Sequence, residues 1–311
     1  MQSRRMGTSG LTVSRLALGT MTWGRTVDLD TAREHLNLFL GAGGTLVDTA
    51  HGYAGGLSEE IIGELVAGLG RDDVVLCTKA GIERRDEQRV VDTSRGALMR
   101  SLEESLARLR TDHVDLWLVH TWSEEAPLEE TLSALEWAIS TGRARYVGVS
   151  NYSGWQVARA ATLLQQVRVP LVANQVEYSL VNRGPEDELA GAATALGFGM
   201  MPWSPLGRGV LTGKYRHGIP PDSRAASREF PGFTGRFLDD RSAAIVEGLV
   251  TAARGLDVSP AEVALAWVRD RPGVTSPVIG ARTTAQLRTL LSSEDVVLPG
   301  EIVAALEEVS A

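Results

Sequence analysis

The strongest constraint in the sequence is an alternation of short apolar runs with amphipathic helical stretches, which continues from one end of the chain to the other. The apolar runs have the length of buried strands and lie at 15–18, 45–47, 74–77, 114–119, 146–149, 171–174, 199–201 and 277–279. The helical patterns lie at 29–40, 58–69, 92–108, 128–140, 154–166, 187–196, 260–269 and 283–291. Such strands pair in parallel through right-handed crossovers. Because no long polar linker divides them, we predict one domain over residues 1–311.

Three segments fall outside this repeat. A β-hairpin that turns at Thr8-Ser9-Gly10 is expected before the first strand. The segment 216–237 contains Gly, Pro and Arg without a clear period, and we interpret it as a long functional loop after the seventh strand. An extra helix is expected at 299–310, after the eighth unit. The candidate helix N-caps are Asp30, Ser58 and Ser259.

Polar side chains follow the apolar runs, one strand after another, and they help to separate a closed barrel from an open sheet. They are Asp48, Lys79, His120, Ser150 with Asn151, Gln175, Trp203, and Gly280 with Arg282. In a closed barrel these strand ends all face the carboxyl-terminal rim, where such folds hold their active sites. An open sheet would spread them along an edge, and the G-x-G-x-x-G fingerprint of dinucleotide-binding open sheets is absent. We therefore predict an α/β fold, a (β/α)8 TIM barrel with an N-terminal β-hairpin and an extra C-terminal helix.

Composition and charge exclude several other classes of protein. The 31 basic and 39 acidic residues give a net charge of −8, which disfavours nucleic acid or an anionic membrane as a partner. No apolar run approaches 18 residues and no apolar segment follows Arg4 and Arg5, so we expect a cytoplasmic protein. The single cysteine, Cys77, cannot form an internal disulfide. The five histidines lack metal-ligand spacing, so we expect no metal.

Eight short segments at the predicted strand ends carry a resemblance to a known family. They are LALGTMTWG (16–24), VDTAHGY (47–53), LCTKAG (76–81), VDLWLVH (114–120), YVGVSNY (146–152), NQVEYS (174–179), PWSPLGRGVLTGKY (202–215) and PVIGARTTAQL (277–287). In this order they make the chain resemble the aldo-keto reductase superfamily over nearly its whole length. The resemblance implies a (β/α)8 barrel that binds NADPH without a Rossmann fold and reduces the carbonyl groups of aldehydes or ketones.

The same resemblance implies a catalytic tetrad of Asp48, Tyr53, Lys79 and His120. Hydride delivery to a carbonyl carbon leaves charge on the oxygen, so the site must supply a proton or a strong donor there. Tyr53 is the expected donor, although an unperturbed tyrosine pKa of about 10 makes it a weak acid near neutrality. We expect Lys79 to lower that pKa and Asp48 to hold the ammonium. Neutral His120 would donate to the same oxygen.

The resemblance also assigns the cofactor site. Its residues are Gly19, Thr20, Met21, Asp48, Ser150, Asn151, Gln175, Trp203, Ser204, Pro205, Leu206, Gly207, Gly209, Leu211, Lys214, Gly280, Arg282 and Gln286. The polar trio around Ser150 would hold the nicotinamide carboxamide, Trp203 would stack on its ring, and the glycine-containing loop would wrap the pyrophosphate. A guanidinium at Arg282 can grip a 2′-phosphate bidentately, which favours NADPH over NADH.

The chain departs from the family pattern near the adenine. The family often has Glu-Asn shortly after the position of Gln286, whereas this chain reads Leu287-Arg288-Thr289-Leu290. In this sequence Arg288 would instead add charge to the phosphate site. The substrate, a small carbonyl compound, would contact an aromatic mouth, and the residues expected there are Trp23, Tyr53, His120 and Trp122. The sequence does not specify an oligomeric state.

Two other functions remain open at this point. One is an NADPH-binding regulatory protein with slow turnover, like the potassium-channel β-subunits of the same superfamily. The other is a barrel hydrolase that uses Asp48 and His120. The hydrolase would leave the nicotinamide residues, including Gln175 and Trp203, without a role, so it ranks last.

Overall fold

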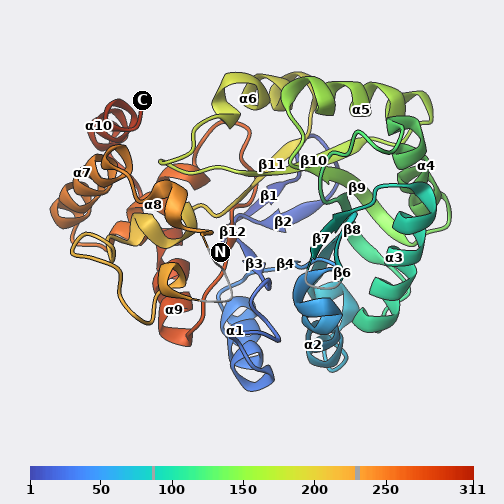
Figure 1. Cartoon of the computed structure of the whole chain (residues 1–311), viewed down its shortest axis with the longest axis horizontal. Helices are drawn as coiled ribbons and strands as arrows, with labels where there is room; N and C mark the ends of the chain where they lie inside the picture. The colour runs from blue at the N-terminus through green and yellow to red at the C-terminus, as the bar shows by residue number, and fades with distance from the viewer. Residues whose placement is uncertain (86–87, 228–231) are drawn as a thin grey trace.

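Eight parallel strands form the centre of the protein (Figure 1). The computed structural model describes residues 1–85, 88–227 and 232–311. Its main sheet has the order β11-β10-β9-β8-β5-β4-β3-β12. The bounds are β3 Ala17–Gly19, β4 Leu46–Asp48, β5 Val75–Ala80, β8 Val114–Val119, β9 Ala144–Ser150, β10 Leu171–Glu177, β11 Gly199–Trp203 and β12 Val278–Ile279. These are the eight predicted strands, with small shifts at their ends.

The two edges of the sheet meet and close it into a barrel. The Met200 amide of β11 donates to the Gly273 carbonyl at 2.8 Å, and the Thr275 amide donates to the Met200 carbonyl at 2.9 Å. The residues just before β12 therefore pair with β11, so the two edge strands of the sheet, β11 and β12, are joined. This closure confirms the predicted barrel and excludes the open sheet.

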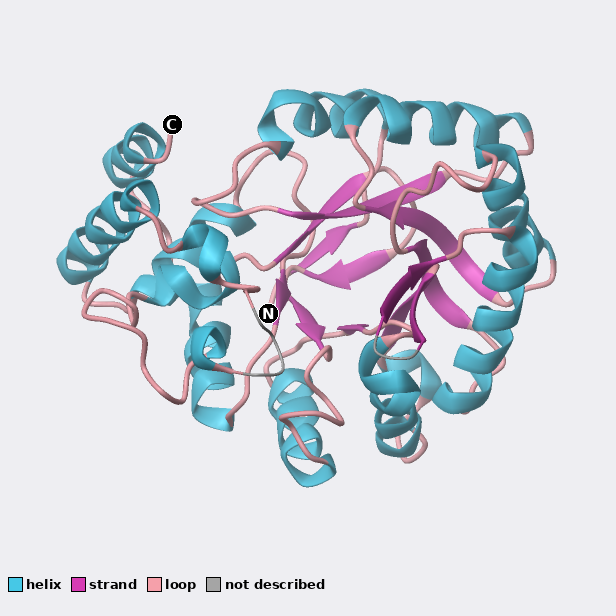
Figure 2. Cartoon of the chain, in the orientation of Figure 1, coloured by secondary structure: helices cyan, strands magenta, loops and turns pink. Residues whose placement is uncertain are grey.

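Helices surround the strands on the outside, as Figure 2 shows. Their bounds are α1 Leu29–Gly41, α2 Leu57–Val66, α3 Arg95–Leu109, α4 Leu128–Ser140, α5 Gly154–Gln166, α6 Pro185–Leu196, α7 Asp240–Leu256, α8 Pro260–Arg269 and α9 Thr284–Ser292. The expected C-terminal helix is α10, Gly300–Val309. None of the helices in the described ranges is long and apolar enough to cross a membrane.

Short elements complete the chain. The N-terminal hairpin consists of β1 (Ser3–Arg5) and β2 (Thr12–Ser14), which pair antiparallel and confirm the expected turn. Short 3-10 segments are η1 Tyr53–Gly56, η2 Arg71–Asp73, η3 Gly207–Thr212, η4 Arg224–Ala226, η5 Gly235–Phe237 and η6 Ser293–Asp295. Within the predicted loop 216–237, the described residues contain only η4 and η5; positions 228–231 lie outside the described residues.

Two elements in the described part of the chain differ from the predicted ones. Helix α7 begins after Asp239, whose side chain accepts from the Ser242 amide, and its buried face includes Ile245, Val246 and Leu249. This capping residue and helical spacing are visible in the sequence and could have identified the helix. The antiparallel strands β6 (Ile82–Arg85) and β7 (Gln88–Val91) form the other element. Their charged sequence lacks the apolar alternation that marks a half-buried strand.

Helix starts were predicted correctly in one case out of three. Ser259 caps α8 through a capping box with Glu262. By contrast, α1 begins after Asp28, which accepts from the Thr31 amide, so Asp30 is not the cap. Ser58 lies inside α2 and is buried, where its hydroxyl donates to the Thr20 carbonyl. An N-cap is defined by backbone geometry, and residue type alone does not locate it.

Strand alternation divides the buried residues into an inner and an outer layer. The residues that fill the barrel interior are Met6, Leu11, Val13, Ala17, Leu46, Cys77, Leu116, Leu118, Val172, Ala173 and Met201. Several come from the N-terminal hairpin, which therefore covers the amino-terminal end of the barrel. On β5, Leu76 belongs to the outer layer and Cys77 to the inner one. Because side chains alternate along a strand, Lys79 shares the inner side with Cys77.

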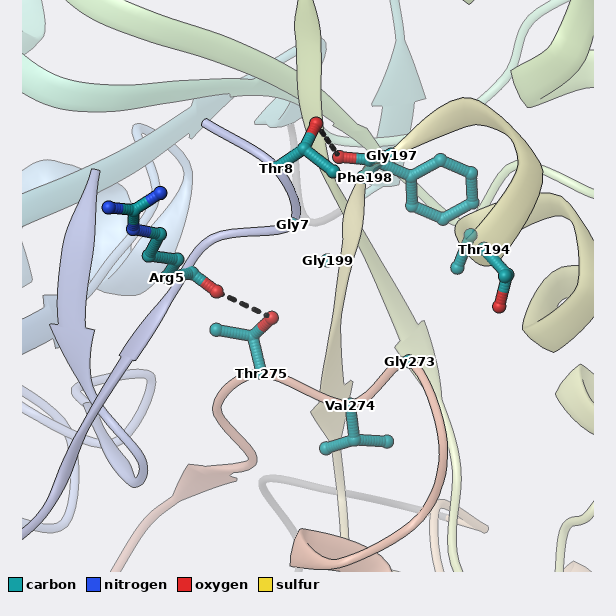
Figure 3. A pocket seen from close by; sticks show the side chains of 11 residues that line it. Arg5, Gly7, Thr8, Thr194, Gly197, Phe198, Gly199, Gly273, Val274 and Thr275 are labelled. Atoms are coloured by element: carbon teal, nitrogen blue, oxygen red, sulfur yellow. Dashed lines mark hydrogen bonds between the residues drawn. The ribbon is translucent and has the colours of Figure 1, made fainter. Parts of the chain in front are cut away.

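A small cavity lies at this amino-terminal end, under the hairpin (Figure 3). It measures about 260 Å³, and its lining includes Gly7, Thr8, Gly197 and Gly199. Gly199 is the first residue of β11, so the cavity is at the opposite end of that strand from Trp203. Gly7 has φ of 57°, and a Cβ there would lie 2.1 Å from the Gly197 carbonyl oxygen. The hairpin turn thus requires glycine where it packs against the barrel.

The buried Ser14 hydroxyl joins the hairpin to the barrel and gives a stability prediction. Its Oγ accepts from the amides of Thr45 and Leu46 at 2.9 and 3.2 Å and donates to the Leu16 carbonyl at 2.7 Å. Ser14→Ala would leave these groups unpaired, so we expect the free energy of unfolding to fall by about 2 kcal/mol in urea denaturation. Ser140→Ala, at an exposed helix end, is the control and should change it little. Equal effects of the two substitutions would contradict this assignment.

Candidate active site

A buried ion pair lies at the carboxyl-terminal end of the barrel. Asp48 is the last residue of β4 and Lys79 the penultimate residue of β5. Lys79 Nζ donates to both carboxylate oxygens of Asp48 at 2.8 Å and to the Thr49 carbonyl at 2.7 Å. The two residues are 2% and 0% exposed. All three ammonium hydrogens therefore have acceptors inside the protein, which is the condition under which a buried lysine keeps its charge.

The charge on Lys79 follows from two opposing effects on its pKa. Burial alone would lower that pKa, because a low-dielectric site disfavours the ammonium. Burial is the largest single effect, but the charge and hydrogen bond of the Asp48 carboxylate, with smaller contributions from Tyr53 and Cys77, together outweigh it, and the pKa of Lys79 is raised above its ordinary value. Lys79 is therefore a fixed cation across the physiological pH range.

Tyr53 begins the η1 turn that follows β4. Its ring centroid lies 5.3 Å from Lys79 Nζ, and its residue is only partly buried. Burial raises the pKa of the phenol, whereas the nearby charge of Lys79 lowers it. The net direction is upward, opposite to the lowering we expected from sequence. The reason is that the sequence identifies the cation but gives no measure of desolvation. The phenol is therefore protonated at neutral pH and can donate its proton.

His120 follows β8 and completes the group of four. Its ring meets that of Tyr53 edge to face, with centroids 5.8 Å apart. Burial lowers the pKa of His120 well below its ordinary value, and the charges of Lys79 and Arg89 lower it further. The imidazole is therefore neutral at pH 7, as its expected role requires. Its Nδ1 is buried without a hydrogen-bond partner in the described part of the chain.

The amide side chains predicted to hold the nicotinamide form a connected network beside this group. Gln175 Nε2 donates to Asp48 Oδ1 at 2.7 Å, and Ser150 Oγ donates to the Gln175 carbonyl at 2.8 Å. Asn151 has φ of 60° and donates through Nδ2 to the His120 carbonyl at 2.9 Å. Trp203 Nε1 donates to Asn151 Oδ1 at 3.0 Å. The ends of five strands, β4, β8, β9, β10 and β11, are thus fixed relative to one another by side-chain hydrogen bonds.

The loop after β11 has a backbone suited to an anion. Ser204, Gly207, Arg208 and Gly209 all have positive φ, at 51°, 54°, 58° and 97°. A Cβ on Gly207 would lie 2.5 Å from Val181 Cγ2, so this position requires glycine for space as well as conformation. A run of such residues turns successive amides in unusual directions and is typical of anion-binding concavities. Among its predicted members, Leu211 is buried and Lys214 is exposed.

Positive charge gathers beside this loop. Burial lowers the pKa of the Arg224 guanidinium, and the charges of Arg282 and Arg208 lower it further. Arg208 is bound through Nε and Nη2 by the carboxylate of Glu177 at 2.7 and 3.0 Å, and Arg236 reaches the same carboxylate at 2.7 Å. Glu177 was not among the site residues predicted from the sequence. Glu177 is an acidic residue at the end of β10, inside the segment NQVEYS. Its role becomes visible only when the structure places the loop after β11 beside it.

The predicted adenosine end lies at the start of α9. The Arg282 amide donates to Gln286 Oε1 at 2.9 Å, and Thr283 caps the helix. Gly280 lies between β12 and Arg282, and Arg288 is exposed on α9. Closer to the ion pair, Thr20 Oγ1 donates to the Asp48 carbonyl at 3.0 Å. Gly19 packs against β12, where a Cβ would lie 2.7 Å from Val278 Cγ1.

The predicted substrate residues are placed differently from one another. Trp23 is 1% exposed and packs in the hydrophobic core, so it offers little surface to a ligand. Trp122 is partly exposed and packs edge to face against Tyr152 and Trp155 at 5.2 and 5.3 Å. Met21 is partly exposed. Within the described ranges, no group of three His, Cys, Asp or Glu side chains is arranged to hold a metal ion.

Comparison with known proteins identifies the family of the chain. Residues 15–311 match the model of the aldo/keto reductase family. A probable voltage-gated potassium channel subunit beta of Oryza sativa subsp. japonica is 37% identical over 99% of this chain and 96% of its own length. The uncharacterized oxidoreductase YrpG of Bacillus subtilis (strain 168) is 35% identical over 99% and 96%. L-glyceraldehyde 3-phosphate reductase of Escherichia coli (strain K12) is 34% identical over 92% and 86%. The chain belongs to the aldo/keto reductase family.

The buried ion pair predicts a large effect on stability. Asp48→Asn would leave the Lys79 ammonium buried without a counter-charge, so we expect the free energy of unfolding at pH 7 to fall by about 3–5 kcal/mol. Because the pKa of Lys79 is raised in the folded wild type, its contribution is complete below the unfolded pKa and is lost as the pH rises through the folded value. Denaturation in urea measures the change. Asp72→Asn, at an exposed position, is the control and should be close to neutral.

Proposed function

We propose that this protein is an NADP-dependent carbonyl reductase. The observation that carries the proposal is the single cluster of Asp48, Lys79, Tyr53 and His120 at one end of a closed barrel. It combines a protonated phenol, a fixed cation next to that phenol and a neutral imidazole. This combination suits proton donation to a carbonyl oxygen that gains charge. A hydrolase would instead need a nucleophile or an activated water, and it would leave the amide network around Asn151 without a role.

The residues present fit a bound NADPH. The amide network beside the ion pair would hold the nicotinamide, with Ser150, Asn151 and Gln175 as donors and acceptors and Trp203 as the stacking surface. Positive-φ residues from Ser204 to Gly209 provide an anion-binding backbone for the pyrophosphate. The charges of Arg282 and Arg208 both act on Arg224, so three guanidinium groups concentrate positive charge where the phosphates would bind. Arg282 would grip the 2′-phosphate.

In the proposed reaction each residue of the cluster has its own role. Reduced nicotinamide, when bound, supplies a hydride to the carbonyl carbon. Tyr53 Oη donates its proton to the carbonyl oxygen, so the carbonyl becomes an alcohol and the phenol becomes a phenolate. Lys79 stabilises that phenolate by its positive charge, and Asp48 holds Lys79 in place. Neutral His120 donates a hydrogen bond to the same oxygen and orients the substrate before proton transfer. Water then returns a proton to Tyr53.

Substrate class and cellular setting form part of the proposal. Small aldehydes or ketones fit a site flanked by Tyr53, His120 and Trp122, and similarity to L-glyceraldehyde 3-phosphate reductase supports an aldehyde. A net charge of −8 disfavours a nucleic-acid partner, and we place the reaction in the cytoplasm as part of the proposal.

Similarity to a probable potassium channel subunit beta favours one alternative, an NADPH-binding regulatory protein with slow turnover. The same side chains would then bind the nucleotide and sense its oxidation state. Steady-state consumption of NADPH with a panel of aldehydes separates the two functions. Turnover of many equivalents per protein supports the reductase, whereas a single equivalent followed by slow nucleotide release supports the regulator.

Tyr53→Phe tests the proton donor. It removes the only hydroxyl assigned to the carbonyl oxygen, so we expect kcat for aldehyde reduction to fall by about 10²–10⁴-fold. The affinity for NADPH, measured by the fluorescence of the bound nicotinamide, should change little. Normal reduction by this variant would show that Tyr53 is not the donor.

Arg282→Ala tests the nucleotide preference. A charged hydrogen bond contributes about 1.5–3 kcal/mol, so we expect the Kd for NADPH to rise by about 10- to 100-fold while that for NADH stays nearly constant. Arg254→Ala, on the exposed side of α7, is the matched control. If the affinities for NADPH and NADH fall equally, Arg282 does not recognise the 2′-phosphate.

A further inference from the structure

The turn that carries Tyr53 has an unfavourable backbone conformation. Ala54 has φ of 51°, and Gly55 and Gly56 follow at 67° and 100°. Only glycine adopts such values freely, and a non-glycine residue there persists when the surrounding structure holds it. The position of the phenol therefore depends on contacts that fix this turn from outside.

Arg108 of α3 makes those contacts at both ends of the turn. Its Nη1 donates to the His51 carbonyl at 3.3 Å, just before the turn. Its guanidinium also covers Gly56 at the other end, where a Cβ would lie 2.5 Å from the Arg108 Cζ. One side chain thus spans the segment in which Tyr53 is held. Glu104, one helical turn earlier, lies 3.6 Å from Arg108 Nη2 and 2.8 Å from His51 Nε2.

Glu59 of α2 connects Arg108 with the strand that carries Lys79. This carboxylate is 0% exposed, so it needs strong partners. One oxygen accepts from Thr78 Oγ1 at 2.6 Å, and the other accepts from Arg108 Nη1 at 3.3 Å. Thr78 directly precedes Lys79 on β5. A continuous path therefore runs from β5 through Glu59 and Arg108 to the Tyr53 turn.

A need for stability alone does not explain this arrangement. Buried ion pairs contribute little net stability compared with apolar side chains of the same size, because the desolvation of both charges opposes their attraction. A directional pair does fix distances, however, and proton transfer depends on distance. A displacement of about 1 Å in a reacting group can lower a rate by about a hundredfold.

We propose that Arg108 and Glu59 are positioning residues that hold the Tyr53 phenol in register with Lys79. This inference rests on the proposed function, in which Tyr53 is the proton donor. Neither residue reaches substrate or cofactor; both act through the backbone of the Tyr53 turn. Loss of the guanidinium would let the turn move relative to β5 while the Asp48–Lys79 pair and the nucleotide residues stay in place.

A double-mutant cycle tests the proposal. Arg108→Met keeps most of the aliphatic stem and removes the charge and its hydrogen bonds. We expect kcat to fall by about 10- to 100-fold with little change in the NADPH affinity. In the Tyr53→Phe background the same substitution should cause almost no further loss, because the group that it positions is already absent. Arg100→Met, on the exposed side of the same helix, is the control.

Each outcome of the double-mutant cycle supports or overturns the proposal. A loss of kcat that is equal in the two backgrounds, or no loss in either, overturns the positioning role. Full activity of Tyr53→Phe alone overturns the proposed donor, and the inference falls with it, which distinguishes the two failures. If Arg108→Met does not fold, Glu59→Gln gives the same test. It keeps the shape of the side chain and removes the charge that holds Arg108, so a selective fall in kcat that is again absent in the Tyr53→Phe background supports the proposal.

Discussion

The Asp48–Lys79 ion pair is the interaction on which the site depends. Two charges taken out of water are costly unless their hydrogen bonds are complete, and here the Thr49 carbonyl and the Gln175 amide complete them. The cation then acts on its neighbours. It disfavours a second positive charge on His120 and opposes the effect of burial on the Tyr53 phenol. The protonation states of the site therefore follow from burial together with the charge of this pair.

Barrel geometry explains why residues distant in the sequence can share this site. On β5 successive side chains point alternately into and out of the barrel, which brings Lys79 to the interior at the carboxyl-terminal end. The parallel register places Asp48 opposite Cys77, so Lys79 lies one inward step further along its strand and can reach back to the carboxylate. Closure through the segment at Gly273–Thr275 then brings the last strand beside the others.

The sequence predicted the parts of the structure that depend on local pattern. Apolar runs followed by polar residues located the strands and placed Asp48, Lys79 and His120 at their ends, because a strand end is marked by its own residues. Tyr53 was predicted only from the family resemblance. Burial could not be predicted in this way. Burial raises the pKa of Tyr53, where the sequence predicted a lowering, and it places Trp23 in the core rather than at the predicted substrate site. It also pairs Glu59 with Arg108, although in the sequence both resemble ordinary charges on helix surfaces.

The two ends of the proposed nucleotide site differ in their net charge. At the reacting end the Asp48–Lys79 pair is neutral overall, and neutral His120 adds no charge. At the phosphate end Glu177 offsets part of the charge of Arg208 and Arg236, while Arg224 and Arg282 add to it. Local fields within about a Debye length matter more to a bound anion than net charge does. The proposed function is thus compatible with an acidic chain. Positive charge at one end would bind the phosphates of the nucleotide, and the other end, where a small carbonyl compound would gain a proton, would stay free of excess charge.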